Sequence, residues 1–379
     1  MEFNTVSENE ENLKNELAKK ADPESKRILR FLNMPDLSRT SGSPINEMVR
    51  RILSLKIFSD FDIIKVPEIV DTNTYFELFD FPKDHPARSK SDSYFVDGDK
   101  YILRAHTTIM WYYYLSEPMV KQKIVDGKPV GSLSYGKVYR KDEIDRNHMN
   151  VFHQMDGWYL CRKDEKIINS EDLQNVLIEI AKAVFGENTK YRFNDDRFPY
   201  TDPSLEMEIE INGKWIEVLG CGVVKGSVLK NLGVDPDIYN GWAFGFGLER
   251  LAIISMDLPD IRLLWSDDER VKKQLRLGNK FKEVSKFPPI TRDVSFVVDK
   301  DFVPNNYFDL IRDIGGNLVE EVRLLDKYEN PGKFGPNKIS YTYRIIYRSN
   351  ERTLEAAEID PIQSRIYEET KNQFNAEVR

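Results

Sequence analysis

Two arginines lie among apolar neighbours at positions where they could hold phosphate. Arg140 ends the strand-like segment GKVYR, and Arg250 lies early in an apolar helix after the glycine-rich segment GWAFGFG. A guanidinium group presents a fixed fork of donors that matches phosphate oxygens, and it keeps its charge at any working pH. Glu217, on an expected strand, could hold Mg²⁺ on such phosphates. Taken singly, each of the three could instead be an ion-paired or solvated residue, so both interpretations stay open.

Histidine and glycine patterns suggest two other kinds of site, and both fail on spacing. The four histidines fall within one stretch of chain: His85, His106, His148 and His153. The last two are five residues apart, which suits neither one helix face nor one strand face, and no HExxH or Cys/His pattern accompanies them. In GWAFGFGLER, Arg250 occupies the place of the third glycine of a dinucleotide-binding fingerprint, and no βαβ unit surrounds it. Zinc is therefore disfavoured and a nicotinamide cofactor is excluded.

Composition limits the classes of partner. The chain has 379 residues, 40% hydrophobic and 12% aromatic, which is enough for two domains. Its net charge of −8 provides no global basic field, so an RNA partner must be bound by a local cluster. Cys161 and Cys221 are too few for a disulfide framework or a cysteine zinc site. We expect no membrane partner, because no apolar run approaches the roughly 20 residues of a membrane span.

The elements that must position these residues are mostly strands. Alternating apolar and polar residues predict strands in YFVDG, KYILRA, GKVYR, GWYLC, EMEIEI and KWIEVLGCG. Helical patterns cover residues 109–121, 170–185 and 249–256. Upstream, we expect a charged surface helix over residues 7–30, an ordered domain that starts near the helix of residues 45–58, and an edge or interface strand in the proline-containing DFDIIKVPEIV. This strand-rich order predicts an α+β fold around an antiparallel sheet flanked by helices.

A second domain is expected after the polar run DDERVKKQLRLGNKFKEVSKFPP. The order beyond it is strand DVSFVVD, helix NYFDLIRDIGG, strands EEVRLLDKYE and SYTYRIIYRS, helix DPIQSRIYEETKNQF and a short final segment, residues 377–379. This βαββαβ order predicts a ferredoxin-like domain. Because many unrelated functions use that fold, it predicts no function by itself.

Several long segments, in fixed order, resemble one enzyme family. GKVYRKDEIDRNHMNVFHQMDGW resembles motif two of class II aminoacyl-tRNA synthetases, and GWAFGFGLERLAII resembles motif three. FDFPKDHPARSKSDSYF, LRAHTT, RFPYTDPSLEMEIEINGKWIEVLGCGVV and MDLPDIRLLW are similar to the catalytic subunit of phenylalanyl-tRNA synthetases. KFPPITRDVSF and YRSNERTL resemble the ferredoxin-fold anticodon-binding domain, fused here as in the single-chain organellar enzymes. The expected domains are a charged extension in residues 1–36, the class II catalytic domain in 37–265, a linker in 266–284 and the anticodon-binding domain in 285–379.

The resemblance implies that ATP adenylates phenylalanine, which then passes to the 3′-terminal adenosine of tRNA-Phe, without a covalent enzyme nucleophile. Catalysis would rest on alignment and on charges placed where the transition state becomes negative. By the motif match, Arg140 holds the α-phosphate and Arg250 the γ-phosphate. The other implied ATP-site residues are Asp142, His148, Phe152 for adenine stacking, Gly247, and Glu217 for Mg²⁺.

The same match implies an amino-acid pocket. Its residues are His106, Thr108, Gln154 and Asp156 for the amino and carboxylate ends, Phe198 and Tyr200 for the ring, and Ala243 and Gly245 for the floor. The family usually has Phe, Glu, Ser and Gln where this chain has Tyr200, Asp156, Thr108 and Trp111. The extra hydroxyl of Tyr200 could bind a polar ring substituent or point away. We expect phenylalanine to remain preferred, because the small floor residues are kept.

An RNA-binding face in residues 285–379 must come from clustering, because this part holds 14 Lys and Arg against 16 Asp and Glu. Arg344, Arg348 and Arg352 recur at four-residue spacing, which places the first two on one strand face and Tyr343 and Tyr347 on the other. Phosphate contact combined with base stacking is a common way to bind single-stranded RNA. A solvated strand face is the alternative for each arginine.

Two other function classes stay open at this point. A synthetase paralogue could activate an aromatic amino acid and pass it to a non-tRNA acceptor, whereas a non-catalytic binding module is disfavoured because Arg140 and Arg250 are both present. We expect a cytoplasmic enzyme or, as a processed form, one in an organellar matrix. The fused domain predicts a monomer, although the segment around Pro67 could support a homodimer.

Overall fold

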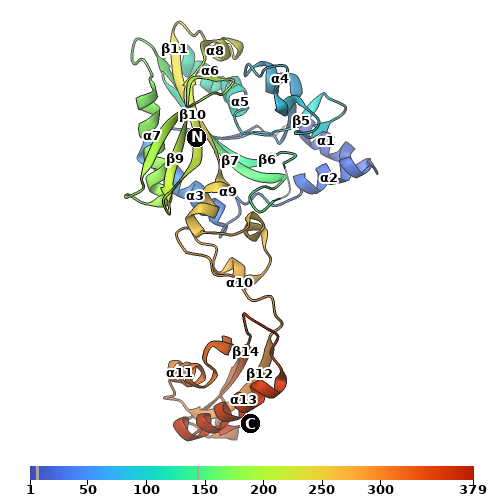
Figure 1. Cartoon of the computed structure of the whole chain (residues 1–379), viewed down its shortest axis with the longest axis vertical. Helices are drawn as coiled ribbons and strands as arrows, with labels where there is room; N and C mark the ends of the chain where they lie inside the picture. Colours follow the sequence, from blue (N-terminus) through green and yellow to red (C-terminus); the bar gives the residue numbers. More distant parts are fainter. Residues whose placement is uncertain (6–7, 143–144) are drawn as a thin grey trace. The chain divides into compact units, whose positions relative to one another are not determined.

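The computed structural model describes residues 1–5, 8–142 and 145–379, which form two compact units (Figure 1). The first unit is Met1–Phe281 and the second is Lys282–Arg379. The division falls within the polar run that ends in the proline pair. No helix in these described ranges is long and apolar enough to cross a membrane.

The first unit is built on an eight-stranded sheet. In order across it, the strands are β1 (Glu2–Asn4), β2 (Asp62–Lys65), β6 (Val130–Tyr139), β7 (Val151–Arg162), β11 (Tyr239–Gly247), β10 (Lys214–Val224), β9 (Thr201–Ile211) and β8 (Tyr191–Asp196). The first three strands are parallel, and every later pair is antiparallel. The expected α+β fold around an antiparallel sheet is confirmed.

Helices and a small sheet surround the large one. The small antiparallel sheet has the order β3 (Ile69–Asp71), β5 (Tyr101–Leu103) and β4 (Phe95–Val96). The helices are α1 (Glu8–Lys19), α2 (Pro23–Leu32), α3 (Pro44–Leu53), α4 (Thr72–Glu77), α5 (Met110–Ser116), α6 (Pro118–Val125), α7 (Ser170–Phe185), α8 (Gly226–Asn231), α9 (Leu248–Met256) and α10 (Glu269–Lys272). Short 3₁₀ turns are η1 (Lys56–Phe58), η2 (Pro86–Arg88) and η3 (Ile261–Trp265).

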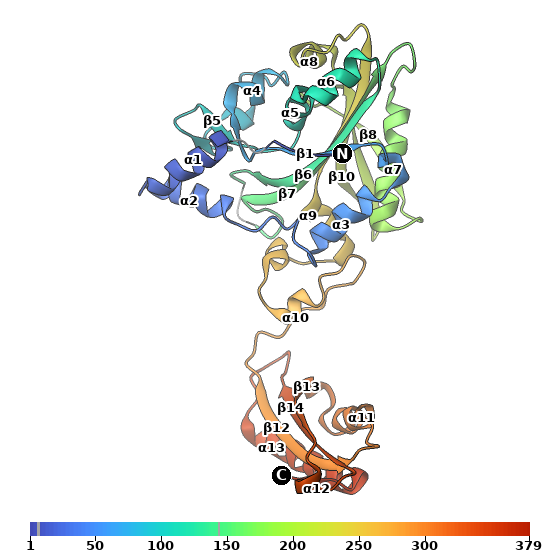
Figure 2. The same ribbon diagram turned by 180° about the vertical axis from the view of Figure 1, so that it is seen from behind.

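The two faces of the large sheet carry different partners. Side chains alternate along β7, so Phe152, Gln154 and Asp156 point to one face, which we call the front, and His153 points to the other, the back. On the front, Trp111 of α5 stacks on Trp158 of β7 with ring centroids 5.2 Å apart, inside a large apolar core. On the back, α3, α7 and α9 pack on one another and on the sheet (Figure 2).

The N-terminal residues differ from their prediction. The single surface helix expected over residues 7–30 is wrong, because Pro23 starts a second helix with Asp22 as its cap; Ser7 lies outside the described residues. Leu17, Ile28 and Phe31 are buried in one hydrophobic cluster. Strand β1 pairs with β2, with Glu2 opposite Ile63, so ordered structure begins well before residue 45.

Prolines also divide two other predicted elements. The helix expected over residues 109–121 is two helices, since Pro118 begins α6. DFDIIKVPEIV is two strands in different sheets, with Pro67 between β2 and β3. The expected edge position is wrong for β2, because β1 covers its outer side, but it is confirmed for β3, which lies at an edge of the small sheet.

The second unit has the predicted βαββαβ order. It consists of β12 (Ile290–Asp299), α11 (Pro304–Gly315), η4 (Gly316–Leu318), β13 (Val319–Tyr328), α12 (Pro331–Phe334), β14 (Lys338–Tyr347), α13 (Ala356–Phe374) and β15 (Glu377–Val378). The sheet order is β13, β14, β12, β15, and its neighbours are antiparallel. Helices α11 and α13 pack together, and the core lies beneath them. The ferredoxin-like fold is thus confirmed.

Candidate active site

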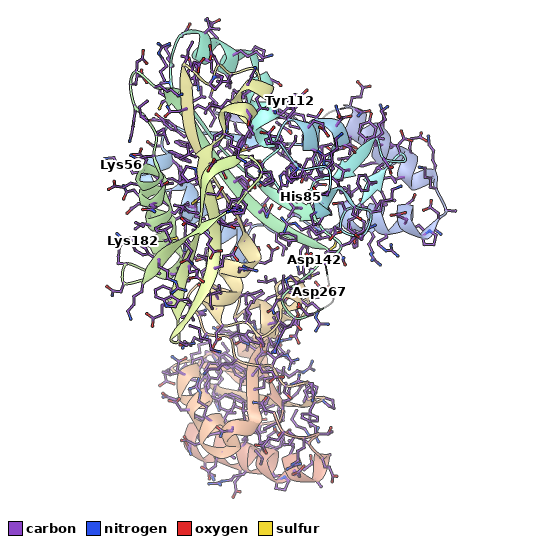
Figure 3. All side chains as sticks on the ribbon, turned by 45° about the horizontal axis from the view of Figure 1, so that its top comes forward. Lys56, His85, Tyr112, Asp142, Lys182 and Asp267 are labelled. Carbon is purple, nitrogen blue, oxygen red and sulfur yellow. The ribbon has the colours of Figure 1, made fainter. Side chains whose placement is uncertain are left out.

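A pocket of about 550 Å³ opens on the front face of the large sheet. This volume is in the usual range for small-molecule sites. Every residue that the sequence assigned to ATP or to the amino acid lines it: His106, Thr108, Arg140, Asp142, His148, Phe152, Gln154, Asp156, Phe198, Tyr200, Glu217, Ala243, Gly245, Gly247 and Arg250. His85 and Asp142, both on the pocket wall, are labelled in Figure 3. Residues as far apart in the sequence as His106 and Arg250 are therefore brought together, as the motif match implied.

Glycines leave room for two functional side chains. Gly245 of β11 lies opposite Asp156 of β7, and a Cβ there would be 2.7 Å from the Asp156 Oδ1. A Cβ on Gly220 of β10 would be 2.7 Å from the Phe198 ring. A larger residue at either position would force the carboxylate or the ring to move. The floor of the pocket is therefore open because the sequence places glycine where the carboxylate and the ring approach the backbone.

Asp156 is a buried carboxylate held by two hydroxyls. Thr107 Oγ1 donates to its Oδ1, and Thr108 Oγ1 donates to its Oδ2, each at 2.6 Å. Burial raises the pKa of Asp156 to about 6, although the two threonines and the positive charges of Arg104 and Arg140 act in the opposite direction. Thr108, which we expected to contact the substrate directly, thus holds the carboxylate. Thr107 was missed, and only the adjacent, similar residue in LRAHTT could have indicated it.

Several polar atoms in the pocket have no protein partner among the described residues. They are both ring nitrogens of His106, Oε1 of Gln154 and Nε1 of Trp111. Burial lowers the pKa of His106 well below its ordinary value, and the nearby Arg140 lowers it further, so the ring is neutral at pH 7. The His106 ring is fixed by stacking on Tyr75, with centroids 4.4 Å apart. Unpartnered buried groups are costly, and a ligand can relieve that cost.

Aromatic rings form the other side of the pocket. Phe198 and Tyr200 lie nearly parallel, with centroids 6.2 Å apart, and Tyr200 meets Trp111 edge-on at 5.8 Å. Burial and the negative charge of Asp156 raise the pKa of Tyr200 to about 12, so its phenol keeps its proton at neutral pH. The hydroxyl interacts with Thr108, which places it toward the polar end of the pocket.

Among the described residues, the Arg140 side chain makes one hydrogen bond and leaves most of its donors available. It follows β6, and its Nε donates to the Ala105 carbonyl at 2.9 Å. Its guanidinium lies over the Phe152 ring, 5.1 Å from the centroid. Within the part of the chain that the structure describes, no carboxylate forms an ion pair with it. The arrangement suits a phosphate beside a stacked base.

Arg250 lies at the pocket mouth, in the first turn of α9. Its Nη1 is 3.5 Å from Glu217 Oε2 and 3.4 Å from the Glu217 carbonyl, and both side chains are 51% exposed. Such a long, exposed contact is weak and can exchange for a ligand. Glu217 also fits a magnesium site, because Mg²⁺ typically takes one or two protein carboxylates and completes its shell with phosphates and water.

The loop beside the mouth contributes additional residues. His148 Nδ1 lies 2.9 Å from both carboxylate oxygens of Asp145. Asn147, Met149 and Ile261 also line the pocket, although the sequence did not assign them a role. The signal for the first two was their place inside the motif-two loop. Ile261 has no such signal before the fold is known, because it comes from η3.

The second unit holds its three candidate RNA-binding arginines in ion pairs. Arg344 binds Asp293 through two contacts of 2.8 Å, Arg348 Nε lies 2.9 Å from Glu320, and Arg352 Nη1 lies 2.8 Å from Glu358. Arg344 and Tyr343 are on opposite faces of β14, as the spacing predicted. However, Tyr343 and Tyr347 are buried in the core, so they do not offer rings to bases.

Comparison with known proteins agrees with this geometry. Residues 31–275 match the tRNA synthetases class II core domain (F), and residues 285–379 match the ferredoxin-fold anticodon binding domain. The chain is 39% identical to the chloroplastic/mitochondrial phenylalanine–tRNA ligase of Arabidopsis thaliana, over 82% of this chain and 71% of that protein. It is 36% identical to the mitochondrial enzyme of Mus musculus (82% and 73%) and 32% identical to that of Saccharomyces cerevisiae (86% and 84%). The chain therefore belongs to the phenylalanine–tRNA ligases, as a single-chain class II aminoacyl-tRNA synthetase with a fused ferredoxin-fold anticodon-binding domain.

Proposed function

We propose that the front-face pocket is where this ligase adenylates phenylalanine, with Arg140 and Arg250 as its catalytic residues. The observation that carries the proposal is that every residue implied by the motif match lines one cavity. Within it, Thr108 holds Asp156, while Arg140 reaches the pocket from the end of β6 and Arg250 from the start of α9.

In the proposed reaction, a carboxylate oxygen of phenylalanine attacks the α-phosphorus of ATP, and pyrophosphate leaves with the electron pair of the broken P–O bond. Arg140 neutralises negative charge at the α-phosphate, and its guanidinium and Phe152 form one wall for the nucleotide. Arg250 leaves its loose contact with Glu217 to bind the γ-phosphate. Because these groups are placed before the reaction, little reorganisation is needed in the transition state. Mg²⁺, held partly by Glu217, would neutralise further phosphate charge when bound.

The amino acid is proposed to bind between Asp156 and the aromatic wall. Its ammonium group has two acceptors nearby, the unpartnered Oε1 of Gln154 and the carboxylate of Asp156. The phenyl ring packs against Phe198 and Tyr200 above the Ala243 floor. The Tyr200 hydroxyl lies near Thr108 and the Asp156 carboxylate, at the polar end of the pocket.

This arrangement predicts a preference for phenylalanine over tyrosine. In amino-acid-dependent ATP–pyrophosphate exchange, kcat/KM should be higher with phenylalanine. Tyr200→Phe should change the value for phenylalanine by less than about threefold, because one partly satisfied hydroxyl is removed. Faster exchange with tyrosine than with phenylalanine would contradict the assignment of the ring pocket.

Transfer to tRNA-Phe is the second half of the proposed activity. The relatives named above are all tRNA ligases, and none of them supports a non-tRNA acceptor. We propose that Arg344, Arg348 and Arg352 contribute to tRNA binding by exchanging their carboxylate partners for phosphates. The test is charging of a tRNA-Phe transcript with labelled phenylalanine. Robust pyrophosphate exchange without charging would instead favour a different acceptor.

Compartment and assembly complete the proposal. The relatives are named as mitochondrial or chloroplastic enzymes, which favours an organellar matrix over the cytoplasm. A fluorescent fusion of the full-length gene product tests this, and diffuse cytosolic signal would oppose it.

We propose a monomer, and light scattering at assay concentration should give the mass of one 44.3 kDa chain.

A further inference from the structure

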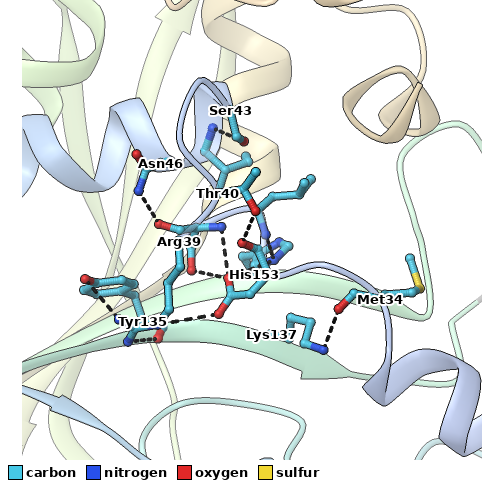
Figure 4. A network of polar contacts seen from close by, with 12 residues as sticks. Met34, Arg39, Thr40, Ser43, Asn46, Tyr135, Lys137 and His153 are labelled. Carbon is cyan, nitrogen blue, oxygen red and sulfur yellow. Dashed lines mark hydrogen bonds and ion pairs between the residues drawn. The ribbon is translucent and has the colours of Figure 1, made fainter. Parts of the chain in front are cut away.

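The back face of the sheet, opposite the pocket, carries two buried charged or titratable side chains on the strands that bear the site. Lys137 of β6 and His153 of β7 are register partners and are 3% and 0% exposed. Each binds residues 32–37, which connect α2 to the rest of the unit and which we call the back segment. The Lys137 ammonium donates to the Leu32 carbonyl at 2.7 Å and to the Met34 carbonyl at 2.8 Å, and the second bond is drawn in Figure 4.

His153 joins the back segment to α9. Its Nδ1 donates to Glu249 Oε1 at 2.6 Å, and the Leu37 N–H donates to its Nε2 at 2.9 Å. Asp36 Oδ1 is farther from Nε2, at 3.3 Å, and accepts from the Ser38 N–H, while Asp36 Oδ2 pairs with Arg39. Burial lowers the pKa of His153, but the carboxylates of Glu249 and Asp36 outweigh it and raise the pKa to about 9. Trp265 covers the ring at 5.6 Å, so water is excluded on that side.

Glu249 accepts a backbone hydrogen bond at the point where the pairing of β7 with β11 ends. The pairing of β7 with β11 stops at Gln154 and Gly247, so the N–H of the next residue, His153, meets no β11 residue on that side of β7. Both Glu249 oxygens accept from it, at 3.0 and 2.8 Å. The carboxylate is 2% exposed and also lies in the first turn of α9, where the helix dipole favours negative charge.

The positions of these residues in the sequence link them to the pocket. His153 lies between Phe152 and Gln154, which face the front, and Glu249 immediately precedes Arg250. One carboxylate therefore joins the strand that presents the adenine-stacking ring to the helix that presents the γ-phosphate arginine. A change in the contact between Glu249 and His153 would therefore move both Phe152 and Arg250, which are proposed to hold the two ends of ATP.

We propose that Glu249, His153 and Asp36 are positioning residues that fix the separation between Phe152 and Arg250, and this rests on the proposed ATP site. Glu249 also borders the pocket. Because both of its carboxylate oxygens are bound by His153, we propose that none of the three touches ATP. The back segment has its own part in the network: it delivers Asp36 and the Leu37 N–H to His153, and Lys137 anchors it.

The proposal is tested by steady-state pyrophosphate exchange on the full chain, with KM measured separately for ATP and for phenylalanine. Glu249→Gln should raise the KM for ATP by about tenfold or more, because donors that the carboxylate now satisfies would be left buried without full acceptors. The KM for phenylalanine should change by less than about threefold, since Asp156 and its threonines lie outside the network. Asp36→Asn, a milder change at the end of the network, should raise the ATP KM by about threefold.

A matched control separates positioning from general stability. Asp62 of β2 is also a buried carboxylate, and it accepts from Tyr114 Oη at 2.6 Å and from Lys123 Nζ at 2.9 Å. Asp62→Asn should lower Tm but leave the KM for ATP unchanged, when all assays are run well below the Tm of every variant. The double variant Asp36→Asn/Glu249→Gln should raise the ATP KM by less than the product of the single effects, because both act through His153.

Two results would overturn the proposal. One is a wild-type KM for ATP in both Glu249→Gln and Asp36→Asn, and the other is an equal rise in both KM values that Asp62→Asn reproduces. Arg250→Ala distinguishes failure of the proposed ATP site from failure of the positioning role alone. If Arg250→Ala itself exchanges normally, the ATP site is misassigned; if it is defective while the network variants are normal, only the positioning role fails.

Discussion

The pocket and the C-terminal domain use arginine in opposite ways. In the pocket, Arg140 has no carboxylate partner among the residues described, and Arg250 has only a long, exposed one. In the C-terminal domain, Arg344 and Arg352 are each bound to a carboxylate by two short contacts. A site whose donors are unpaired is organised for its ligand in advance, whereas a paired surface must first break its own contacts. The difference predicts that the small substrates depend on single side chains and that tRNA binding is spread over many.

The largest effect should come from the pocket arginines. Arg140→Ala and Arg250→Ala should each reduce kcat of pyrophosphate exchange by about 10² to 10³, or ~3 kcal/mol, because each removes one preorganised charge from the transition state. Arg344→Ala is the control, since it removes an arginine of equal charge outside the pocket and should leave exchange unchanged. If Arg344→Ala slowed exchange as much as Arg140→Ala, the contrast between the two regions would fail.

A smaller effect should follow the ionisation of Asp156. Its pKa is raised to about 6 in the folded protein from an ordinary 3.8, mainly by burial. The ionised form attracts the substrate ammonium, so the KM for phenylalanine should fall as pH rises through 6 and become constant above it. The contribution of Asp156 to folding stability changes with pH in the opposite direction. Because its pKa is higher in the folded state, this group stabilises that state most below pH 3.8, and the contribution is lost as pH rises through 6.

Asp156→Asn isolates this group. The variant should have a KM for phenylalanine about 10 to 100 times higher at pH 7.5, and the dependence on pH near 6 should disappear. The KM for ATP is the internal reference and should change little. A wild-type pH profile in Asp156→Asn would mean that another group titrates.

The smallest effect should be found on the C-terminal domain. Arg344→Ala should raise the KM for tRNA-Phe in charging by no more than about threefold, because its exposed pair with Asp293 already screens the charge. Loss of one phosphate contact should also reduce the dependence of that KM on salt. A large loss of charging from this single variant would show that the ion pair is a preformed tRNA contact.

Local signals made part of the fold predictable. Residues 170–185 form α7 as predicted, because Asn169 and Asp172 build a capping box and Gly186 ends the helix. Predictions failed where a proline starts a new helix inside an apparently continuous pattern, at Pro23 and Pro118. Strand β1 could not be predicted from its three residues, because it is held by pairing with β2, about sixty positions away.

The pocket residues were predictable only through motif resemblance, and their partners were not. Asp156 was expected to bind substrate, but the hydroxyls of Thr107 and Thr108 that hold it come from a segment 48 and 49 positions away. The link between His153 and Glu249 spans 96 positions and two elements. Such contacts depend on where the fold places each element, and neither periodicity nor residue type carries that information.

The most direct test of the account is a crystal structure of the full chain with a non-hydrolysable phenylalanyl-adenylate analogue. We expect the phenyl ring against Phe198 and Tyr200, the ammonium group at Gln154 and Asp156, the adenine on Phe152 and the phosphate mimic at Arg140. An analogue bound with its adenine away from Phe152, or with its ammonium group away from Gln154 and Asp156, would contradict the assignment of the pocket.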